Sequence, residues 1–257
     1  MRHISDDVEG AEKICFPNKK HVCCGCTLGK LHQCSFPENP KCSSETLGLI
    51  HLDLLELLTL SYSKYKWVIT FLNDYSSYYR VAFLCKKSDA AEAIKAIFQL
   101  WLNTTSHSVK RLHTDNGREY MTSELKSFLH EQRIFHETSI SHVHQQNGRA
   151  EQLNRTLLEK TQSMWLEAYL PNSWWEFAFA TATYVYNHTS IKRLKWKTPQ
   201  EIFIGERPKI LHLRVFGCGA YVYLPNEVHA NKLTPCSELM IFIGYEDNSY
   251  RFICHTG

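Results

Sequence analysis

The spacing of apolar and polar side chains predicts a group of strands in the first half of the chain, beginning near residue 46. Three β-prone runs, 47–57 (LGLIHLDLLEL), 66–74 (KWVITFLND) and 78–86 (YYRVAFLCK), are separated by short polar stretches. That arrangement is typical of an antiparallel meander. The next run, 88–105, repeats its apolar residues at helical spacing, and Ser88 is its expected N-cap.

Further along, the pattern changes between short strands and longer helices. It predicts strands at 109–115 and 134–138 and helices at 123–132, 146–170 and 174–189. Near the end, glycine-punctuated strands at 213–225 and 239–245 are typical of a small β-barrel. The chain stops soon after them, with little room for a further strand, so we expect the barrel to be truncated.

The first 45 residues have a different composition from the rest. They are rich in Cys and His, their six basic and six acidic residues cancel, and they show no long apolar periodicity. Such a segment buries little apolar surface and needs a metal or a neighbour to become ordered. With ten cysteines and no apolar leader at the N-terminus, the chain is expected to use thiols as metal ligands, and not to be secreted.

Charge and hydropathy narrow the choice of partners. No apolar run approaches the roughly 18–20 residues of a membrane span, so we expect no membrane partner. The formal charge of +3 permits nucleic-acid binding without requiring it. The basic residues gather between 192 and 214, where Lys192, Arg193, Lys195 and Lys197 are candidate contacts for DNA phosphates.

Three carboxylates stand out by position. Asp53 lies within the first strand, Asp115 at the end of the run 109–115, and Glu151 in the first turn of the long helix. If the fold brings them together, their oxygens suit Mg²⁺ or Mn²⁺, and two such ions can serve an in-line phosphodiester displacement. The alternative for each residue is a solvated acid or a helix cap, and spacing alone leaves both readings open.

Several ordered blocks resemble one known family. HTDNGREY (113–120) and HQQNGRAEQLNRTLLE (144–159) resemble the signature blocks of Copia-type retrotransposon integrases, with the family's interval of thirty-five residues between Asp115 and Glu151. HLD (51–53) resembles the first block of that family. Matching segments follow in family order at 71–88, 170–189, 197–208 and 212–223. The resemblance covers essentially the whole chain, which makes it far more specific than one short motif.

This resemblance implies an α/β architecture of three parts. Residues 46–208 would form an RNase H-like core, a mixed five-stranded sheet with flanking helices, together with a helical extension. Residues 1–45 would form a partial zinc-knuckle segment, and 209–257 a truncated small β-barrel of the Src-homology-3 type. The implied activity is DNA 3′-end processing and strand transfer by a homo-oligomer on DNA, and hence a nuclear location.

The resemblance also assigns roles to residues. Asp53, Asp115 and Glu151 become the catalytic triad that binds Mg²⁺ or Mn²⁺, whereas Asp74 and Glu119 are expected to be structural. In the N-terminal segment, His3, Cys23 and Cys26 would be zinc ligands. Three ligands leave the tetrahedral Zn²⁺ site incomplete.

The long helix supports this assignment through its periodicity. Glu151, Arg155 and Gln162 share one face, while a different face carries the residues expected in the core. Arg155 would then lie beside the metal site, where a DNA phosphate would bind. The alternative for Arg155 is a surface salt bridge to Glu151 or Glu159.

Two further functions compete with an active integrase. A non-catalytic nucleic-acid-binding remnant is favoured by the incomplete zinc ligands and the truncated barrel. A ribonuclease H-type nuclease shares the metal chemistry, but the family blocks after Glu151 argue against it. The intact carboxylates favour the integrase.

Overall fold

A mixed sheet of five strands forms the centre of the structure. Its strands are β1 (Ile50–Glu56), β2 (Trp67–Asn73), β3 (Tyr79–Leu84), β4 (Arg111–Thr114) and β5 (Phe135–Thr138). They lie in the order β3-β2-β1-β4-β5. The first three pair antiparallel, which confirms the predicted meander, and β4 and β5 are parallel to β1.

The computed structural model describes residues 43–138, 148–225, 235–246 and 249–254. These residues belong to one unit, Lys41–Gly257. The predicted zinc ligands His3, Cys23 and Cys26 lie outside the described residues. The boundaries 1–45, 46–208 and 209–257 therefore stay predictions.

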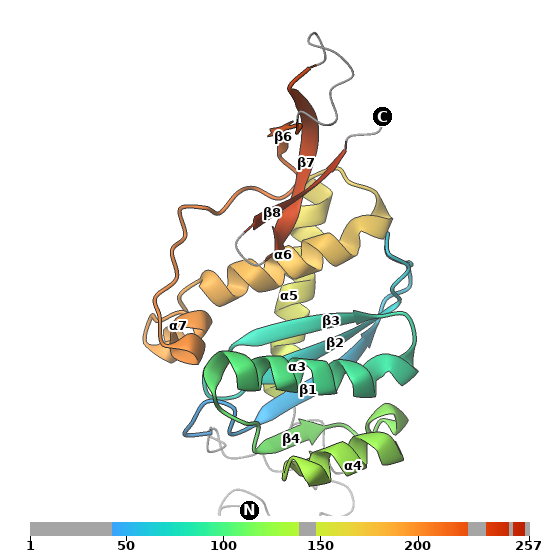
Figure 1. Cartoon of the computed structure of the whole chain (residues 1–257), viewed down its shortest axis with the longest axis vertical. Coiled ribbons are helices and arrows are strands. Elements are labelled where there is room, and N and C mark those ends of the chain that lie inside the picture. The colour runs from blue at the N-terminus through green and yellow to red at the C-terminus, as the bar shows by residue number, and fades with distance from the viewer. Residues whose placement is uncertain (1–42, 139–147, 226–234, 247–248, 255–257) are drawn as a thin grey trace, which may run out of the picture. The chain divides into compact units, whose positions relative to one another are not determined.

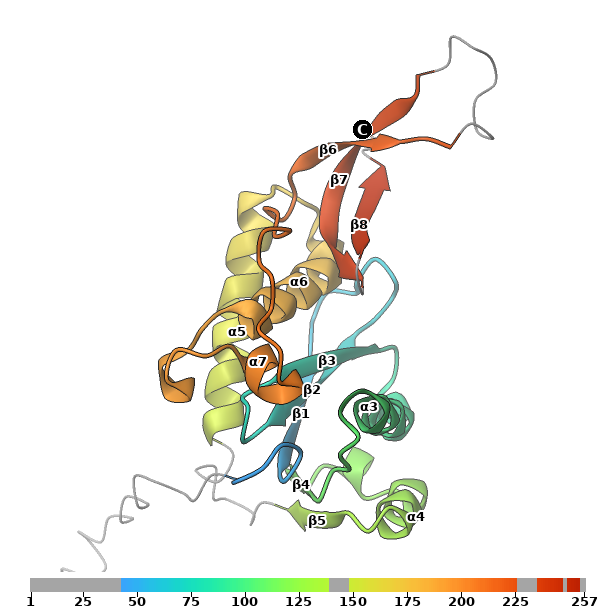
Figure 2. The same ribbon diagram turned by 60° about the vertical axis from the view of Figure 1, so that its left-hand side comes forward.

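Helices cover both faces of the sheet (Figures 1 and 2). Helices α3 (Ala90–Thr105) and α4 (Ser123–Glu131) lie on one face, and α5 (Gly148–Glu167) and α6 (Trp175–His188) on the other. A shorter helix, α7 (Pro199–Ile204), lies within the basic stretch 192–214. The predicted N-cap of α3 is wrong: Asp89 holds that position, because Ser88 lies in the single 3₁₀ turn Lys87–Asp89 that precedes the helix.

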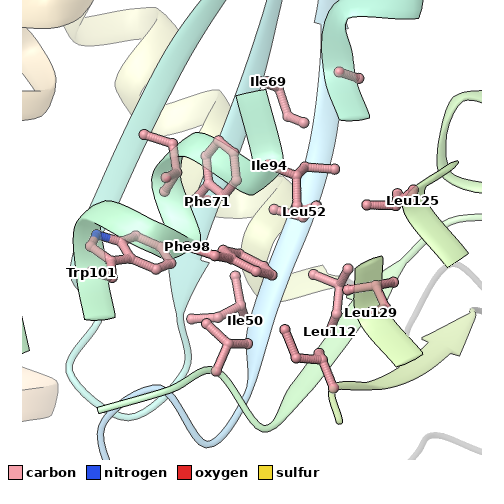
Figure 3. Packing of buried hydrophobic residues seen from close by; sticks show 14 of the residues in the cluster. Ile50, Leu52, Ile69, Phe71, Ile94, Phe98, Trp101, Leu112, Leu125 and Leu129 are labelled. Carbon is pink, nitrogen blue, oxygen red and sulfur yellow. The ribbon is translucent and has the colours of Figure 1, made fainter. Parts of the chain in front are cut away.

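The alternation along β1 and β2 explains how the sheet is buried on both sides. Ile50, Leu52, Ile69 and Phe71 point toward α3 and α4, where they pack with Phe98 and other apolar side chains (Figure 3). Intervening residues of the same strands, among them Val68 and Leu72, pack with α5 and α6 in a second cluster. Each fully buried side chain of this size contributes about 1.5–3 kcal/mol.

A separate antiparallel sheet of three strands follows the core. It contains β6 (Gly219–Tyr223), β7 (Ser237–Glu246) and β8 (Ser249–Cys254), in that order. The expectation of no room for a further strand is wrong, because six residues suffice for β8. A closed barrel stays a prediction.

Close packing joins this sheet to α6. Phe216 and Ile243 cluster with Phe177 and Ala178 of the helix. Gly244 has a φ of +141°, and a Cβ there would lie only 2.8 Å from Oγ1 of Thr181. The glycine therefore lets the backbone of β7 approach the helix as closely as it does.

Candidate active site

The register of β1 and β4 brings two of the predicted carboxylates to the same place. His51 is the pairing partner of His113 in the parallel ladder. Asp53 and Asp115 each lie two residues further along, and side chains two apart in a strand point to the same face. Asp53 is half-buried within β1, whereas Asp115 is exposed just beyond the end of β4.

Helix α5 supplies the third carboxylate from above this face. Glu151 lies in its first turn and is exposed. Residues of the helix and of β1 line a cavity of about 350 Å³ that is open to solvent. Its polar lining residues are Asp53, Glu151, Asn154, Arg155, Glu159 and Gln162. The shared helix face predicted for Glu151, Arg155 and Gln162 is confirmed.

The environment of Asp53 disfavours its charged form. The pKa of Asp53 is raised above its ordinary value, first by burial and then by the negative charges of Asp115 and Glu151. Hydrogen bonds from the side chain of Asn154 and the backbone of Leu54 oppose this rise. A bound cation would relieve both the burial cost and the repulsion.

Both carboxylate oxygens of Asp53 already accept hydrogen bonds. Oδ1 accepts from the Leu54 N–H at 2.9 Å, and Oδ2 from Nδ2 of Asn154 at 2.6 Å. Within the described part of the chain, no group of three His, Cys, Asp or Glu side chains is close enough to hold one ion. Carboxylate oxygens suit a divalent cation in their chemistry, but in this arrangement the three carboxylates are not close enough together to share one.

Asn154 is a site residue that the sequence analysis did not identify. It is buried, and its Oδ1 accepts a hydrogen bond of 2.5 Å from the hydroxyl of the buried Tyr79. The chain Tyr79–Asn154–Asp53 thus joins β3, α5 and β1. A signal was present, because Asn154 follows Glu151 by three residues and a helix places such residues on neighbouring positions of one face.

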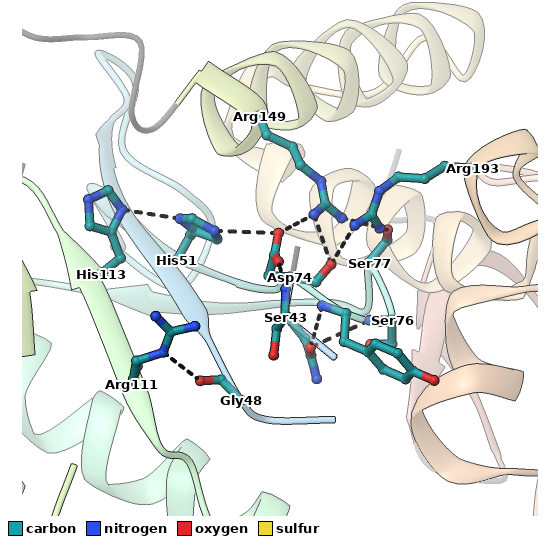
Figure 4. A network of polar contacts seen from close by, with 12 residues as sticks. Ser43, Gly48, His51, Asp74, Ser76, Ser77, Arg111, His113, Arg149 and Arg193 are labelled. Atoms are coloured by element: carbon teal, nitrogen blue, oxygen red, sulfur yellow. Dashed lines mark hydrogen bonds and ion pairs between the residues drawn. The ribbon is translucent and has the colours of Figure 1, made fainter. Parts of the chain in front are cut away.

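The basic side chains predicted to contact DNA differ in the contacts that they make within the protein. Arg155 is exposed and pairs with Glu159 at 3.2 Å, which is the alternative raised for it. Arg193 is exposed too, but its guanidinium donates to Oγ of Ser77 at 2.6 Å (Figure 4).

The three lysines of the same stretch lie at the surface. Lys197 lies 3.8 Å from Glu201, and Lys192 and Lys195 are exposed. An exposed pair of this kind contributes little free energy and leaves the cation accessible to an anion.

Comparisons with known proteins agree with the family resemblance of the sequence and with the five-stranded sheet. Residues 44–143 match the integrase core domain family. The chain is 32% identical over 236 residues to the retrovirus-related Pol polyprotein from transposon TNT 1-94 of Nicotiana tabacum. It is 27% identical over 239 residues to that from transposon RE2 of Arabidopsis thaliana. The chain resembles a retrotransposon integrase.

The matches cover most of this chain but only a small part of each relative. They include 90% and 93% of this integrase-like chain, but the chain spans only 17% and 16% of the two relatives. The resemblance to the integrase region of Copia-type Pol polyproteins is thereby confirmed, and with it the resemblance to a polynucleotidyl transferase.

A solved structure supports the fold of the integrase-like chain. The simian T-cell lymphotropic virus intasome in complex with PP2A regulatory subunit B56 gamma matches with a TM-score of 0.59 at 16% identity. The match covers 92% of this chain and 86% of that chain. The five-stranded mixed sheet with flanking helices fits the RNase H-like fold. Within the described residues, no helix combines the length and apolar character needed to cross a membrane.

Proposed function

We propose that this chain is the catalytic part of a retrotransposon integrase, which processes DNA 3′ ends and joins them to target DNA. The observation that carries the proposal is geometric: His51 pairs with His113 in the parallel ladder two residues before Asp53 and Asp115, and Asp53 and Glu151 line one cavity. Carboxylate oxygens are the ligands that divalent cations of this kind prefer.

Asp53, Asp115 and Glu151 would hold Mg²⁺ or Mn²⁺, which is what the family resemblance implies. When bound, the ions supply an activated oxygen nucleophile and stabilise the leaving oxygen of the phosphodiester. The protein's own part is to hold the three carboxylates against their mutual repulsion. Asn154 contributes by orienting Asp53 through the bond to Oδ2.

DNA is the proposed substrate and partner. Arg155 lines the cavity beside Glu151, and the exposed lysines at 192, 195 and 197 extend a positive surface along the following segment. Contacts of this kind bind the phosphate backbone with little preference for base sequence. Joining two DNA ends requires a homo-oligomer with access to chromosomal DNA, so we propose a nuclear site of action. We also propose an incomplete Zn²⁺ site at His3, Cys23 and Cys26.

A strand-transfer assay with Mg²⁺ or Mn²⁺ tests the enzymatic proposal directly. The informative variant is Asp115→Asn, because this exposed carboxylate makes few contacts on which folding depends. We expect joining to fall by about 100-fold or more, the scale of losing one preorganised electrostatic contact at the transition state. DNA binding should persist.

The matched control is Glu119→Gln, which removes a carboxylate from the same loop. The Glu119 side chain lies against Gly117, so it is positioned to shape the loop around Asp115. We expect this variant to retain most joining activity. If purified wild-type protein binds DNA but joins no ends with either metal, the non-catalytic remnant replaces the integrase as the function.

A further inference from the structure

A buried polar turn between β2 and β3 holds several distant segments together (Figure 4). Asp74 at this turn is buried, and its Oδ2 accepts a hydrogen bond from the Ser43 N–H at 2.6 Å. Its own N–H donates to the carbonyl of Leu49 at 3.0 Å. His51 approaches Oδ1 of Asp74 to 3.7 Å from β1. These contacts fix the turn to the start of the sheet without involving a helix.

Two arginines from distant parts of the sequence converge on this turn. Arg149 pairs with the carboxylate of Asp74, donates to the Asp74 carbonyl at 2.8 Å and donates to Oγ of Ser77 at 2.8 Å. Arg193 donates to the same carbonyl and the same hydroxyl, at 2.8 and 2.6 Å. Several donors thus place each guanidinium with little freedom.

Arg149 occupies an unusual position for a cation. It is the second residue of α5, at the end of the helix where the macrodipole is positive and a positive charge is unfavourable. Its ion pair with Asp74 offsets this cost. Arg149 thus lies at an unfavourable helix position and contacts three acceptors on one turn. This combination indicates that the contact positions the start of α5.

We propose that Asp74 and Arg149 are positioning residues for Glu151, an inference that rests on the proposed function. Glu151 is two residues beyond Arg149, in the same first turn. The ion pair fixes this first turn of α5 to Asp74, which directly follows the end of β2. Strand β2 pairs with β1, which carries Asp53. The contact therefore sets the separation of the two carboxylates across the cavity. Without it, the turn would be free to fray, and Glu151 would leave the place where a cation can bridge it to Asp53.

Two readouts test this inference, neither of which is catalytic. Amide hydrogen exchange at residues 152–155 reports on the first turn of α5, because these amides donate to the carbonyls of residues 148–151. The affinity for Mn²⁺ reports on the geometry of the carboxylates. It is measured from the electron paramagnetic resonance signal of the unbound ion. The variants are Arg149→Met, Arg149→Lys and Asp74→Asn. The control is Lys160→Met, which removes a cation from the same helix outside the cavity lining.

We expect Arg149→Met and Asp74→Asn to accelerate exchange at 152–155 while residues 160–166 stay protected. We also expect Mn²⁺ to bind about 10- to 100-fold more weakly, the usual loss when a supporting partner of a ligand is removed. Arg149→Lys keeps the charge and should recover part of both losses, and Lys160→Met should change neither.

A Glu151→Gln variant separates failure of the inference from failure of the proposed function. Weaker Mn²⁺ binding in Glu151→Gln, with unchanged binding and exchange in Arg149→Met, overturns the positioning role alone. Unchanged Mn²⁺ binding in Glu151→Gln overturns the metal site itself, and the positioning role with it.

Discussion

The pKa values of Asp53, within β1, and Asp74, just beyond the end of β2, are shifted in opposite directions. Burial and the charges of Asp115 and Glu151 raise the pKa of Asp53. Burial acts on Asp74 in the same direction, but hydrogen bonds from His51 and Ser43 and the charge of Arg149 outweigh it and lower its pKa to about 2. Asp74 therefore stabilises the fold as an anion, whereas ionised Asp53 costs stability that a cation would restore.

The stability contributed by Asp74 should depend on pH in one direction. Its carboxyl has a pKa of 3.8 when unfolded and about 2 when folded, so the stabilisation is present above pH 4 and is lost as pH falls toward 2. Asp74→Asn should lower the free energy of unfolding by about 2 kcal/mol at pH 7. Urea unfolding of the metal-free protein at pH 7, 5, 4 and 3 measures the difference from wild type, which should shrink below pH 4.

Glu124→Gln provides the control for this experiment. Glu124 pairs with Lys95 at an exposed site, so its removal should change stability by no more than about 0.5 kcal/mol. A loss in Asp74→Asn that is equal at every pH would contradict an ionic origin.

At the scale of elements, the edge strand β3 depends on a side chain from α6. Asn187 receives the Tyr79 N–H on its Oδ1 at 3.0 Å and donates from Nδ2 to the Tyr79 carbonyl at 2.7 Å. The amide thereby takes the place of a neighbouring strand at this point of the sheet edge. Both residues are buried, so water cannot replace these bonds.

Asn187→Ala should therefore destabilise the protein by about 3 kcal/mol, because it leaves two buried backbone groups without partners. The matched control is Asn103→Ala on the exposed surface of α3, where we expect a change below about 0.5 kcal/mol. Equilibrium denaturation of the two variants gives the comparison. Equal losses at both positions would show that the amide of Asn187 does not hold β3.

At the scale of the whole molecule, charge is distributed unevenly although the net charge is only +3. The segment from Lys192 to Lys197 exposes three lysines, while Asp53, Glu151 and Glu159 line the cavity. Phosphate binding should therefore depend on the lysines, and cation binding on the carboxylates. The two functions can be impaired separately.

The double variant Lys195→Glu/Lys197→Glu should weaken DNA binding on every sequence and lower the slope of log affinity against log salt by about 2. Fluorescence anisotropy across a salt series measures both quantities on two unrelated duplexes. Reversing Lys64 and Lys126 makes the same change of charge at other exposed positions and serves as the control. Equal weakening by the two double variants would remove the special role of the basic segment.

The sequence by itself determined most of the secondary structure of the core and singled out three candidate carboxylates. The β-prone runs predict the antiparallel strands β1 to β3, and the helical spacing of apolar residues predicts α5, because these patterns depend on local geometry alone. The family blocks single out Asp53, Asp115 and Glu151. The prediction of Ser88 as a helix cap was wrong, because the cap depends on where the first helical turn closes. Strand β8 was not predicted, because a strand of six residues depends on its pairing partner.

Only the tertiary structure decided which side chains act together. The parallel pairing of β1 with β4 aligns Asp53 with Asp115, and packing of α5 on the sheet brings Asn154 to Asp53. The turn at Asp74 collects Arg149 and Arg193 from positions 75 and 119 residues away. These relations join segments far apart in the chain, so no local periodicity encodes them, and they arise when long-range packing fixes the distances between charged groups.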